Sequence, residues 1–223
     1  MPERKKTAII IGVTGLTGSI LLQQLLADER YTKIILFTRR VVGFEHPKME
    51  EYLIDLFELE EQQGKFQADE VFCCVGSTQK KTPKKKIYKQ VDYGIPVMAA
   101  KMCREHDIPT FIVISALGAN ASSKFFYNRI KGEMEREVIK QGLKNTHILR
   151  PSLIGGEREE KRRFEFFWKQ VMKTTDFLMF GPMKKFRSIR PETIVKAMIY
   201  LANHPYEETI IKSDLIEEIA AHA

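Results

Sequence analysis

The sequence of 223 residues lacks any apolar run that approaches the roughly 18 to 20 residues needed to cross a membrane. Its basic start, MPERKK, is not followed by a long apolar segment, so we expect no signal peptide. It has only three cysteines, at positions 73, 74 and 103, which form no plausible disulfide framework. Such cysteine usage is typical of a reducing compartment, and we predict a cytoplasmic protein without a membrane span.

Metal-ligand patterns are also missing, because the five histidines show no spacing typical of a metal site. Positive charge is in excess: the formal net charge is +7, with basic clusters at 4–6, 80–81, 84–86 and 161–163. A basic surface attracts any polyanion, but neither a zinc-finger spacing nor an aromatic RNA-binding motif accompanies it. We therefore favour solvated loops over a nucleic-acid site and expect no metal.

What the sequence does contain is an alternation of short apolar runs with helical patterns. The predicted strands are 7–11, 33–37, 51–54, 70–75, 110–114 and 146–149. The predicted helices are 17–29, 55–63, 91–106, 124–141, 191–202 and 214–221. Alternating βαβ units predict an α/β fold, a Rossmann-like doubly wound parallel sheet, in one domain spanning residues 1–223. From 155 to 223 the pattern changes to helix and loop, which we interpret as a small lobe that covers the substrate.

A glycine-rich segment connects the first predicted strand to the first helix and has the spacing GxxGxxG. Glycines allow a tight turn and a close approach to a pyrophosphate, while a helix N-terminus supplies free N–H groups. An ordinary glycine-rich turn is the alternative, but the setting between a buried strand and an amphipathic helix favours a dinucleotide loop. The predicted contacts are Gly12, Thr14, Gly15, Leu16, Thr17 and Gly18.

The end of the second predicted strand carries Arg39 and Arg40 and no acidic residue. An acidic residue there would bind the ribose 2′-hydroxyl of NAD, whereas arginines accommodate the 2′-phosphate of NADP. The alternative is a pair of exposed arginines without a ligand. Their position favours NADP(H) as the cofactor.

Residues after the next two predicted strands complete the expected cofactor site. Asp55 is placed where a carboxylate could accept the adenine amino group, and we include its neighbour Leu56 among the contacts. Cys74, Val75 and Gly76 end the fourth strand, where small residues let the chain pass close to the adenosine.

Three further residues predict a catalytic group: Ser115, directly after the fifth strand, and Tyr127 and Lys131, four apart on a helix. Carbonyl reduction needs a proton donor beside the hydride acceptor, and a neighbouring ammonium stabilises a phenolate. Ser115 could donate a hydrogen bond to the substrate oxygen, and Lys131 could hold the nicotinamide ribose. The alternative makes Tyr127 a packing residue and Lys131 a solvated one.

This combination of motifs resembles the atypical short-chain dehydrogenase/reductases, and more closely the Tat-interacting-protein-like NAD(P)-binding family with its bacterial relatives. The resemblance rests on the segments 37–40, 71–78, 122–127, 131–133 and 149–152. It implies a Rossmann-like fold that binds NADPH, and it supports the assignment of the catalytic group. It also implies that Arg150, Pro151 and Ile154 lie beside the nicotinamide.

Two functions follow as hypotheses. The first is an NADPH-dependent oxidoreductase that acts on a small carbonyl or alcohol, with Tyr127 as general acid and base. The second, motivated by the resemblance, is a non-enzymatic NADPH-sensing regulator that acts through a protein partner. No motif after residue 155 identifies the chemical class of the substrate.

Overall fold

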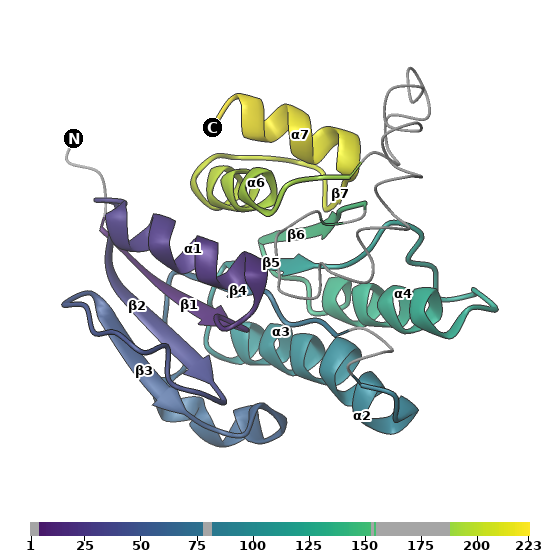
Figure 1. The fold of residues 1–223 in the computed structure, drawn as a ribbon, viewed down its shortest axis with the longest axis horizontal. Helices are drawn as coiled ribbons and strands as arrows, with labels where there is room; N and C mark the ends of the chain where they lie inside the picture. Colours follow the sequence, from purple (N-terminus) through teal and green to yellow (C-terminus); the bar gives the residue numbers. More distant parts are fainter. Residues whose placement is uncertain (1–4, 78–81, 153, 155–187) are drawn as a thin grey trace, which may run out of the picture.

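The computed structural model describes residues 5–77, 82–152, 154 and 188–223. Seven strands in this part of the chain form one parallel sheet in the order β3-β2-β1-β4-β5-β6-β7 (Figure 1). The strands are β1 (Lys6–Ile11), β2 (Tyr31–Thr38), β3 (Met49–Leu53), β4 (Glu70–Cys73), β5 (Thr110–Ile114), β6 (Asn145–Arg150) and β7 (Ile210–Lys212). The strand order reverses between β1 and β4, where doubly wound sheets hold ligands at the carboxyl ends. The predicted α/β class and parallel sheet are confirmed.

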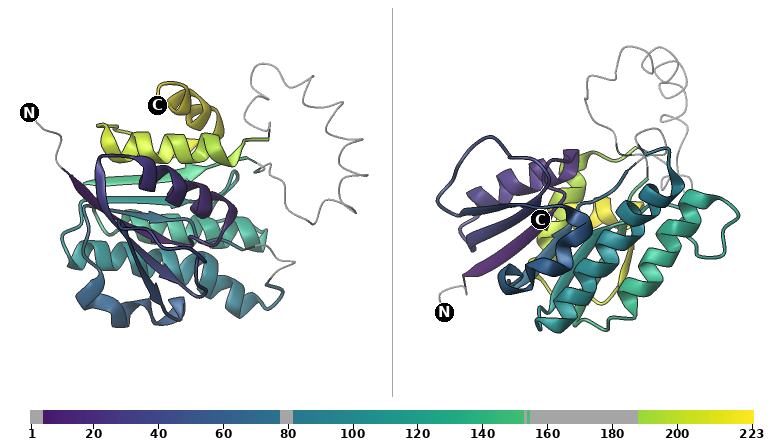
Figure 2. Two further views of the ribbon diagram at one scale, coloured as in Figure 1. Left: turned by 60° about the vertical axis from the view of Figure 1, so that its left-hand side comes forward. Right: turned by 90° about the horizontal axis from the view of Figure 1, so that it is seen from below.

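Helices cover both faces of the sheet (Figures 1 and 2). They are α1 (Leu16–Ala27), the 3-10 helix η1 (Leu56–Lys65), α2 (Lys85–Lys89), the π-helix η2 (Gln90–Gly94), α3 (Ile95–Glu105), α4 (Phe126–Ile139), α6 (Pro191–Asn203) and α7 (Ser213–Ala221). The helices α1, α6 and α7 pack on one face of the sheet, and η1, α3 and α4 pack on the other. Two apolar cores result, one on each side of the sheet.

The predicted helix over 91–106 differs most from the observed structure. It begins earlier and divides into α2, the π-helix η2 and α3. Pro96 lies in the first turn of α3, where a proline is tolerated because its missing N–H breaks no hydrogen bond within α3. The helical path reaches it through the wider turn of the π-helix η2. The predicted helix over 124–141 is shorter, because Gly142 adopts φ +64° beyond its end.

Strand β7 was not predicted, because three residues give too short an apolar run to read from the sequence. It pairs with β6, and α6 and α7 pack over the same face as α1. Residues 188–223 therefore supply one strand of the sheet and two helices that cover it. The remainder of the predicted lobe, 155–187, lies outside the described residues.

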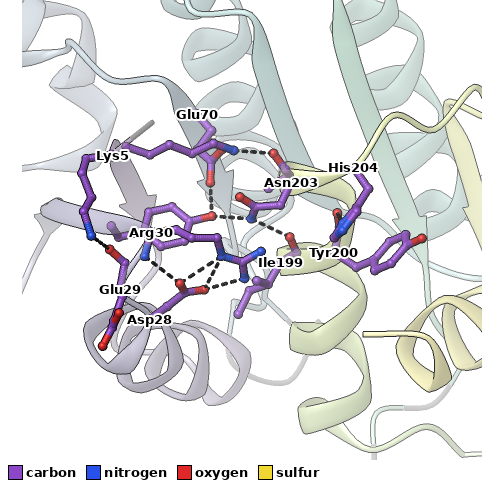
Figure 3. Close-up of polar contacts among 12 residues, drawn as sticks. Lys5, Asp28, Glu29, Arg30, Glu70, Ile199, Tyr200, Asn203 and His204 are labelled. Atoms are coloured by element: carbon purple, nitrogen blue, oxygen red, sulfur yellow. Dashed lines mark hydrogen bonds and ion pairs between the residues drawn. The ribbon is translucent and has the colours of Figure 1, made fainter. Parts of the chain in front are cut away.

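A buried polar network holds the sheet and α6 together at the amino ends of the central strands (Figure 3). The Tyr31 hydroxyl donates a hydrogen bond to Glu70 Oε1, and Lys6 Nζ lies 2.9 Å from Glu70 Oε2. Asn203 Nδ2 donates to the Tyr31 hydroxyl at 2.9 Å, and Lys6 Nζ donates to the carbonyl of Ala202 at 2.7 Å. The carboxylate of a fully buried glutamate is thus provided with partners from β1 and β2.

The network predicts the effect of Tyr31→Phe. The substitution removes the phenol that joins Glu70 to Asn203, so we expect the free energy of unfolding to fall by about 1–3 kcal/mol. Urea denaturation followed by circular dichroism measures it. The matched control is Tyr200→Phe on α6, the helix of Asn203, because the Tyr200 hydroxyl points away from the network in Figure 3. Equal stability of the two variants would contradict a structural role for the network.

Candidate functional site

The turn between β1 and α1 depends on residues without side chains. Gly12 has φ +91°, and a Cβ atom there would lie 2.8 Å from the backbone of Cys74 and of Val75. A Cβ atom on Gly18 would lie 2.3 Å from the carbonyl oxygen of Gly12. The first turn of α1 is therefore pressed onto the end of β1, beside the end of β4.

The N-terminus of α1 faces the carboxyl edge of the sheet with its backbone donors. Gly15 is the N-cap, no side chain caps the helix, and its first turn contains no acidic residue. The first N–H groups of a helix have no partner within it, so those of Leu16 and Thr17 are available to an anion. Thr14 is exposed beside them. An uncapped helix start of this kind is a typical binding site for anions.

The arginines predicted to bind a 2′-phosphate lie after β2, which pairs with β1. Both Arg39 and Arg40 are exposed. Buried Thr38 holds the backbone behind them, because its hydroxyl donates to the Arg40 carbonyl at 2.9 Å. The backbone that carries both guanidinium groups is thus held in place next to the glycine turn.

The residues after β3 and β4 occupy the same edge. Asp55 is exposed and caps η1 by accepting a hydrogen bond from the Phe57 N–H at 3.0 Å. Leu56 is buried in the apolar core, so only its backbone is available to a ligand. Gly76 is exposed, whereas Cys74 is half-buried and Val75 is buried.

Lys131 is buried and makes an ion pair that the sequence analysis missed. Its Nζ lies 3.0 Å from Oδ1 of Asp92, a fully buried residue of η2, and donates to the Ile114 carbonyl at 3.3 Å. The other carboxylate oxygen of Asp92 accepts the Ser77 N–H at 2.9 Å. The alternative interpretation of Lys131 as a solvated residue is therefore wrong. Burial lowers the pKa of Lys131, but Asp92 and Tyr127 act together in the opposite direction, and the pKa of Lys131 lies above its ordinary value.

A second ion pair, between half-buried Arg150 and buried Glu135, lies one helical turn further along α4. Ser115, which is 5% exposed, donates its hydroxyl hydrogen bond to Glu135 Oε1. Arg150 donates to the same carboxylate through Nε at 2.9 Å and Nη2 at 2.5 Å. Glu135 was not predicted, although it lies four residues after Lys131 and eight after Tyr127 and so shares their helical face.

Tyr127 lies on α4 with its ring edge toward Tyr88, at 6.1 Å between ring centroids, and is 40% exposed. In the described part of the chain, no hydrogen bond joins its hydroxyl to Ser115 or Lys131. Partial burial raises the pKa of Tyr127, Asp92 raises it further, and Lys131 offsets only part of the effect. The three predicted catalytic residues thus share one edge of the sheet, and the phenol holds its proton at neutral pH.

The chain beyond β6 returns to this edge. Pro151 is buried, and its carbonyl accepts the Leu117 N–H at 3.0 Å. Ile154 is 40% exposed and forms an isolated bridge with Ile189. Arg150, expected beside the nicotinamide, directs its guanidinium to Glu135.

The described ranges contain neither a metal-binding cluster nor a membrane-spanning helix. Within residues 5–77, 82–152, 154 and 188–223, no group of three or more His, Cys, Asp and Glu side chains could hold a metal ion. No helix in the same ranges has the length and hydropathy required to cross a bilayer.

Comparison with known proteins places the chain among named relatives, although no family model matches it. It is 34% identical over 164 residues to the protein FMP52, mitochondrial, of Candida albicans, covering 69% of each chain. It is 30% identical over 207 residues to FMP52, mitochondrial, of Debaryomyces hansenii, covering 89% of this chain and 88% of the relative. It is 29% identical over 167 residues to the protein HTATIP2 of Rattus norvegicus, covering 73% and 69%.

Solved structures share the fold at low sequence identity. The UDP-N-acetylglucosamine 4-epimerase of Methanobrevibacter ruminantium aligns with a TM-score of 0.68 and 16% identity, covering 93% of this chain and 76% of that one. The Bordetella bronchiseptica enzyme WbmH, solved in complex with NAD+, aligns with a TM-score of 0.66 and 13% identity, covering 89% and 72%.

These names correct one prediction and confirm another. The predicted cytoplasmic location is wrong, because the FMP52 relatives are named as mitochondrial proteins. Cysteine usage argues against an oxidising compartment but cannot choose among reducing ones. The resemblance inferred from the motifs is confirmed, since a relative that is 30% identical spans most of both chains. The chain belongs to the atypical short-chain dehydrogenase/reductase family that includes FMP52 and HTATIP2.

Proposed function

We propose that this chain is an NADP(H)-dependent oxidoreductase that interconverts a small carbonyl compound and its alcohol. The observation that carries the proposal is that the glycine turn before α1 and the Lys131 side chain lie at the same edge of the sheet. A glycine turn with open helix N–H groups lies beside β4, and a Cβ atom on Gly76 would lie 3.9 Å from Lys131 Nζ. The FMP52 names also support a mitochondrial location for this chain.

The residues present fit a dinucleotide. A side chain at Gly12 or Gly18 would clash with backbone, so the turn stays bare for a pyrophosphate against the start of α1. Arg39 and Arg40 supply exposed guanidinium groups for a 2′-phosphate, which favours NADP(H) over NAD. The NAD+ complex of WbmH, a protein of similar fold, supports the dinucleotide class. Bound NADP(H) supplies or accepts the hydride.

The chemistry assigned to the chain is proton transfer. Tyr127 gives its phenolic proton to the carbonyl oxygen during reduction, and its phenolate takes the proton back during oxidation. Lys131 stabilises that phenolate electrostatically. Asp92 opposes this effect, since its carboxylate both pairs with Lys131 and raises the pKa of Tyr127. The balance between the two charges sets how firmly the proton is held.

The double substitution Arg39→Ala/Arg40→Ala tests the cofactor assignment. We expect the Kd for NADPH to rise at least about tenfold, because charge-assisted hydrogen bonds to the 2′-phosphate are lost, while the Kd for NADH stays unchanged. Fluorescence titration with both nucleotides measures it. Arg104→Ala, at the exposed end of α3, is the matched control. If neither nucleotide binds to the wild-type protein, the cofactor proposal fails.

Tyr127→Phe separates chemistry from binding. We expect NADPH affinity to be retained and NADPH oxidation with a panel of small ketones and aldehydes to fall by about 10²- to 10⁴-fold, because the proton donor is lost. Tyr88→Phe, which changes the neighbouring ring, should retain activity. Cofactor binding by a wild-type protein that oxidises NADPH with no member of the panel would favour the cofactor-sensing regulator instead.

Asp92→Asn tests the electrostatic assignment. Removing the carboxylate should lower the pKa of Tyr127, because Asp92 raises it in the wild-type protein. NMR titration of tyrosines labelled at Cζ measures this pKa, with Tyr127→Phe identifying the signal. Glu105→Gln, on the exposed end of α3, should leave the pKa unchanged. A pKa of Tyr127 that is unchanged or higher in Asp92→Asn would refute the assignment.

A further inference from the structure

The serine of the proposed site sits on a buried carboxylate. Ser115 and Glu135 are 5% and 3% exposed, and the Ser115 hydroxyl donates to Glu135 Oε1. Arg150 binds both oxygens of that carboxylate. The Ser115 backbone N–H is also engaged, since it donates to the Leu149 carbonyl at 2.7 Å. Ser115 is therefore held by two hydrogen bonds, one to α4 and one to β6.

The number of protons fixes the direction of these bonds. A hydroxyl has one proton and two lone pairs, whereas an ionised carboxylate can only accept. Arg150 likewise has only donors and cannot accept the serine proton. While the Ser115–Glu135 bond exists, Ser115 has no proton left for another acceptor. It offers lone pairs alone to any molecule at the carboxyl edge.

We propose that Glu135 is a positioning residue that accepts the hydrogen bond from the Ser115 hydroxyl and so leaves Ser115 as a hydrogen-bond acceptor toward the substrate. This role differs from the donor role that the sequence analysis expected for Ser115. It deepens the proposed oxidoreductase function and rests on it.

The consequence for the substrate is a division of labour between Ser115 and Tyr127. A substrate hydroxyl other than the reacting one can donate its proton in a hydrogen bond to Ser115, whereas the reacting oxygen exchanges its proton with Tyr127. Arg150 offsets the negative charge of Glu135. The buried carboxylate therefore repels the negative charge of a transition state less than an unpaired carboxylate would. The arrangement thus selects ligands that present a hydroxyl to Ser115.

A thiol introduced by Ser115→Cys tests this role without substrate or cofactor. A thiol beside a carboxylate keeps its proton, and replacing the carboxylate by an amide next to Arg150 favours the thiolate. We expect the acid dissociation constant of the introduced thiol to rise at least about tenfold from Ser115→Cys to Ser115→Cys/Glu135→Gln. The ultraviolet absorbance of the thiolate measures it, with the wild-type protein as the blank for the three native cysteines.

Two further variants protect the result from a trivial explanation. Ser115→Cys/Glu133→Gln changes a glutamate of the same helix that pairs instead with Lys89 and Arg129, and it should leave the thiol unchanged. If Ser115→Cys/Glu135→Gln fails to fold, Ser115→Cys/Glu135→Gln/Arg150→Met takes its place. It removes both members of the ion pair, so that no charge loses its partner. In this triple variant the thiol pKa should still lie below that of Ser115→Cys, by a smaller amount.

Equal thiol pKa values in Ser115→Cys and in the variants lacking Glu135 would overturn the proposal and leave Glu135 as a packing partner of Arg150. This outcome is independent of the proposed function. A wild-type protein that fails to bind NADPH would reject the oxidoreductase proposal even if the thiol titrates as expected. A protein that binds NADPH and reduces a ketone, with an unshifted thiol, would reject only the role of Glu135.

Discussion

Two ion pairs of α4, one buried and one half-buried, are the constraint on which the carboxyl edge of the sheet depends. Lys131 pairs with Asp92 and Glu135 pairs with Arg150, so one helix is anchored to the π-helix η2 and to β6. Removing one partner of such a pair costs about 3–5 kcal/mol, because the other charge is left buried. The helix therefore cannot rotate or slide without exposing or orphaning a charge. The position of Tyr127, on the same face, follows from these anchors.

Close backbone contacts at glycines fix the same edge of the sheet together with the ion pairs. A Cβ atom on Gly132 would lie 2.1 Å from the backbone nitrogen of Ala121, so the loop after β5 rests directly on α4. Gly12 and Gly18 allow an equally close contact between α1 and the end of β1. Both contacts bring backbone, which carries fixed dipoles, to the same edge. Steric constraint on one side and buried charge on the other thus fix the two halves of the proposed site relative to each other.

The parts of this arrangement that could be predicted are those encoded by local pattern. Strand β5 has the bounds expected from its continuous β-branched run, and the glycine spacing predicted the β1–α1 turn. Asp92 and Glu135 escaped prediction because an acidic residue on a helix usually faces water. Only their own burial beside Lys131 and Arg150 identifies them, and that burial depends on tertiary contacts. The choice between NADP and NAD rests on exposed arginines, whose contacts the fold alone does not determine.

The two edges of the sheet hold their buried polar groups in different ways. At the amino edge, Glu70 and Tyr31 have partners for every side-chain oxygen. Among the described residues, the buried side-chain atoms without a hydrogen bond are Asp92 Oδ1, which has only its ion pair, and His106 Nε2, at the end of α3. Asp92 lies next to Gly76, at the edge that also holds the open N–H groups of α1. A carboxylate oxygen that has an ion pair but no hydrogen bond can still accept one from a ligand. The amino edge thus holds the fold together, and the carboxyl edge leaves polar groups of α1 and η2 available to the cofactor of the proposed function.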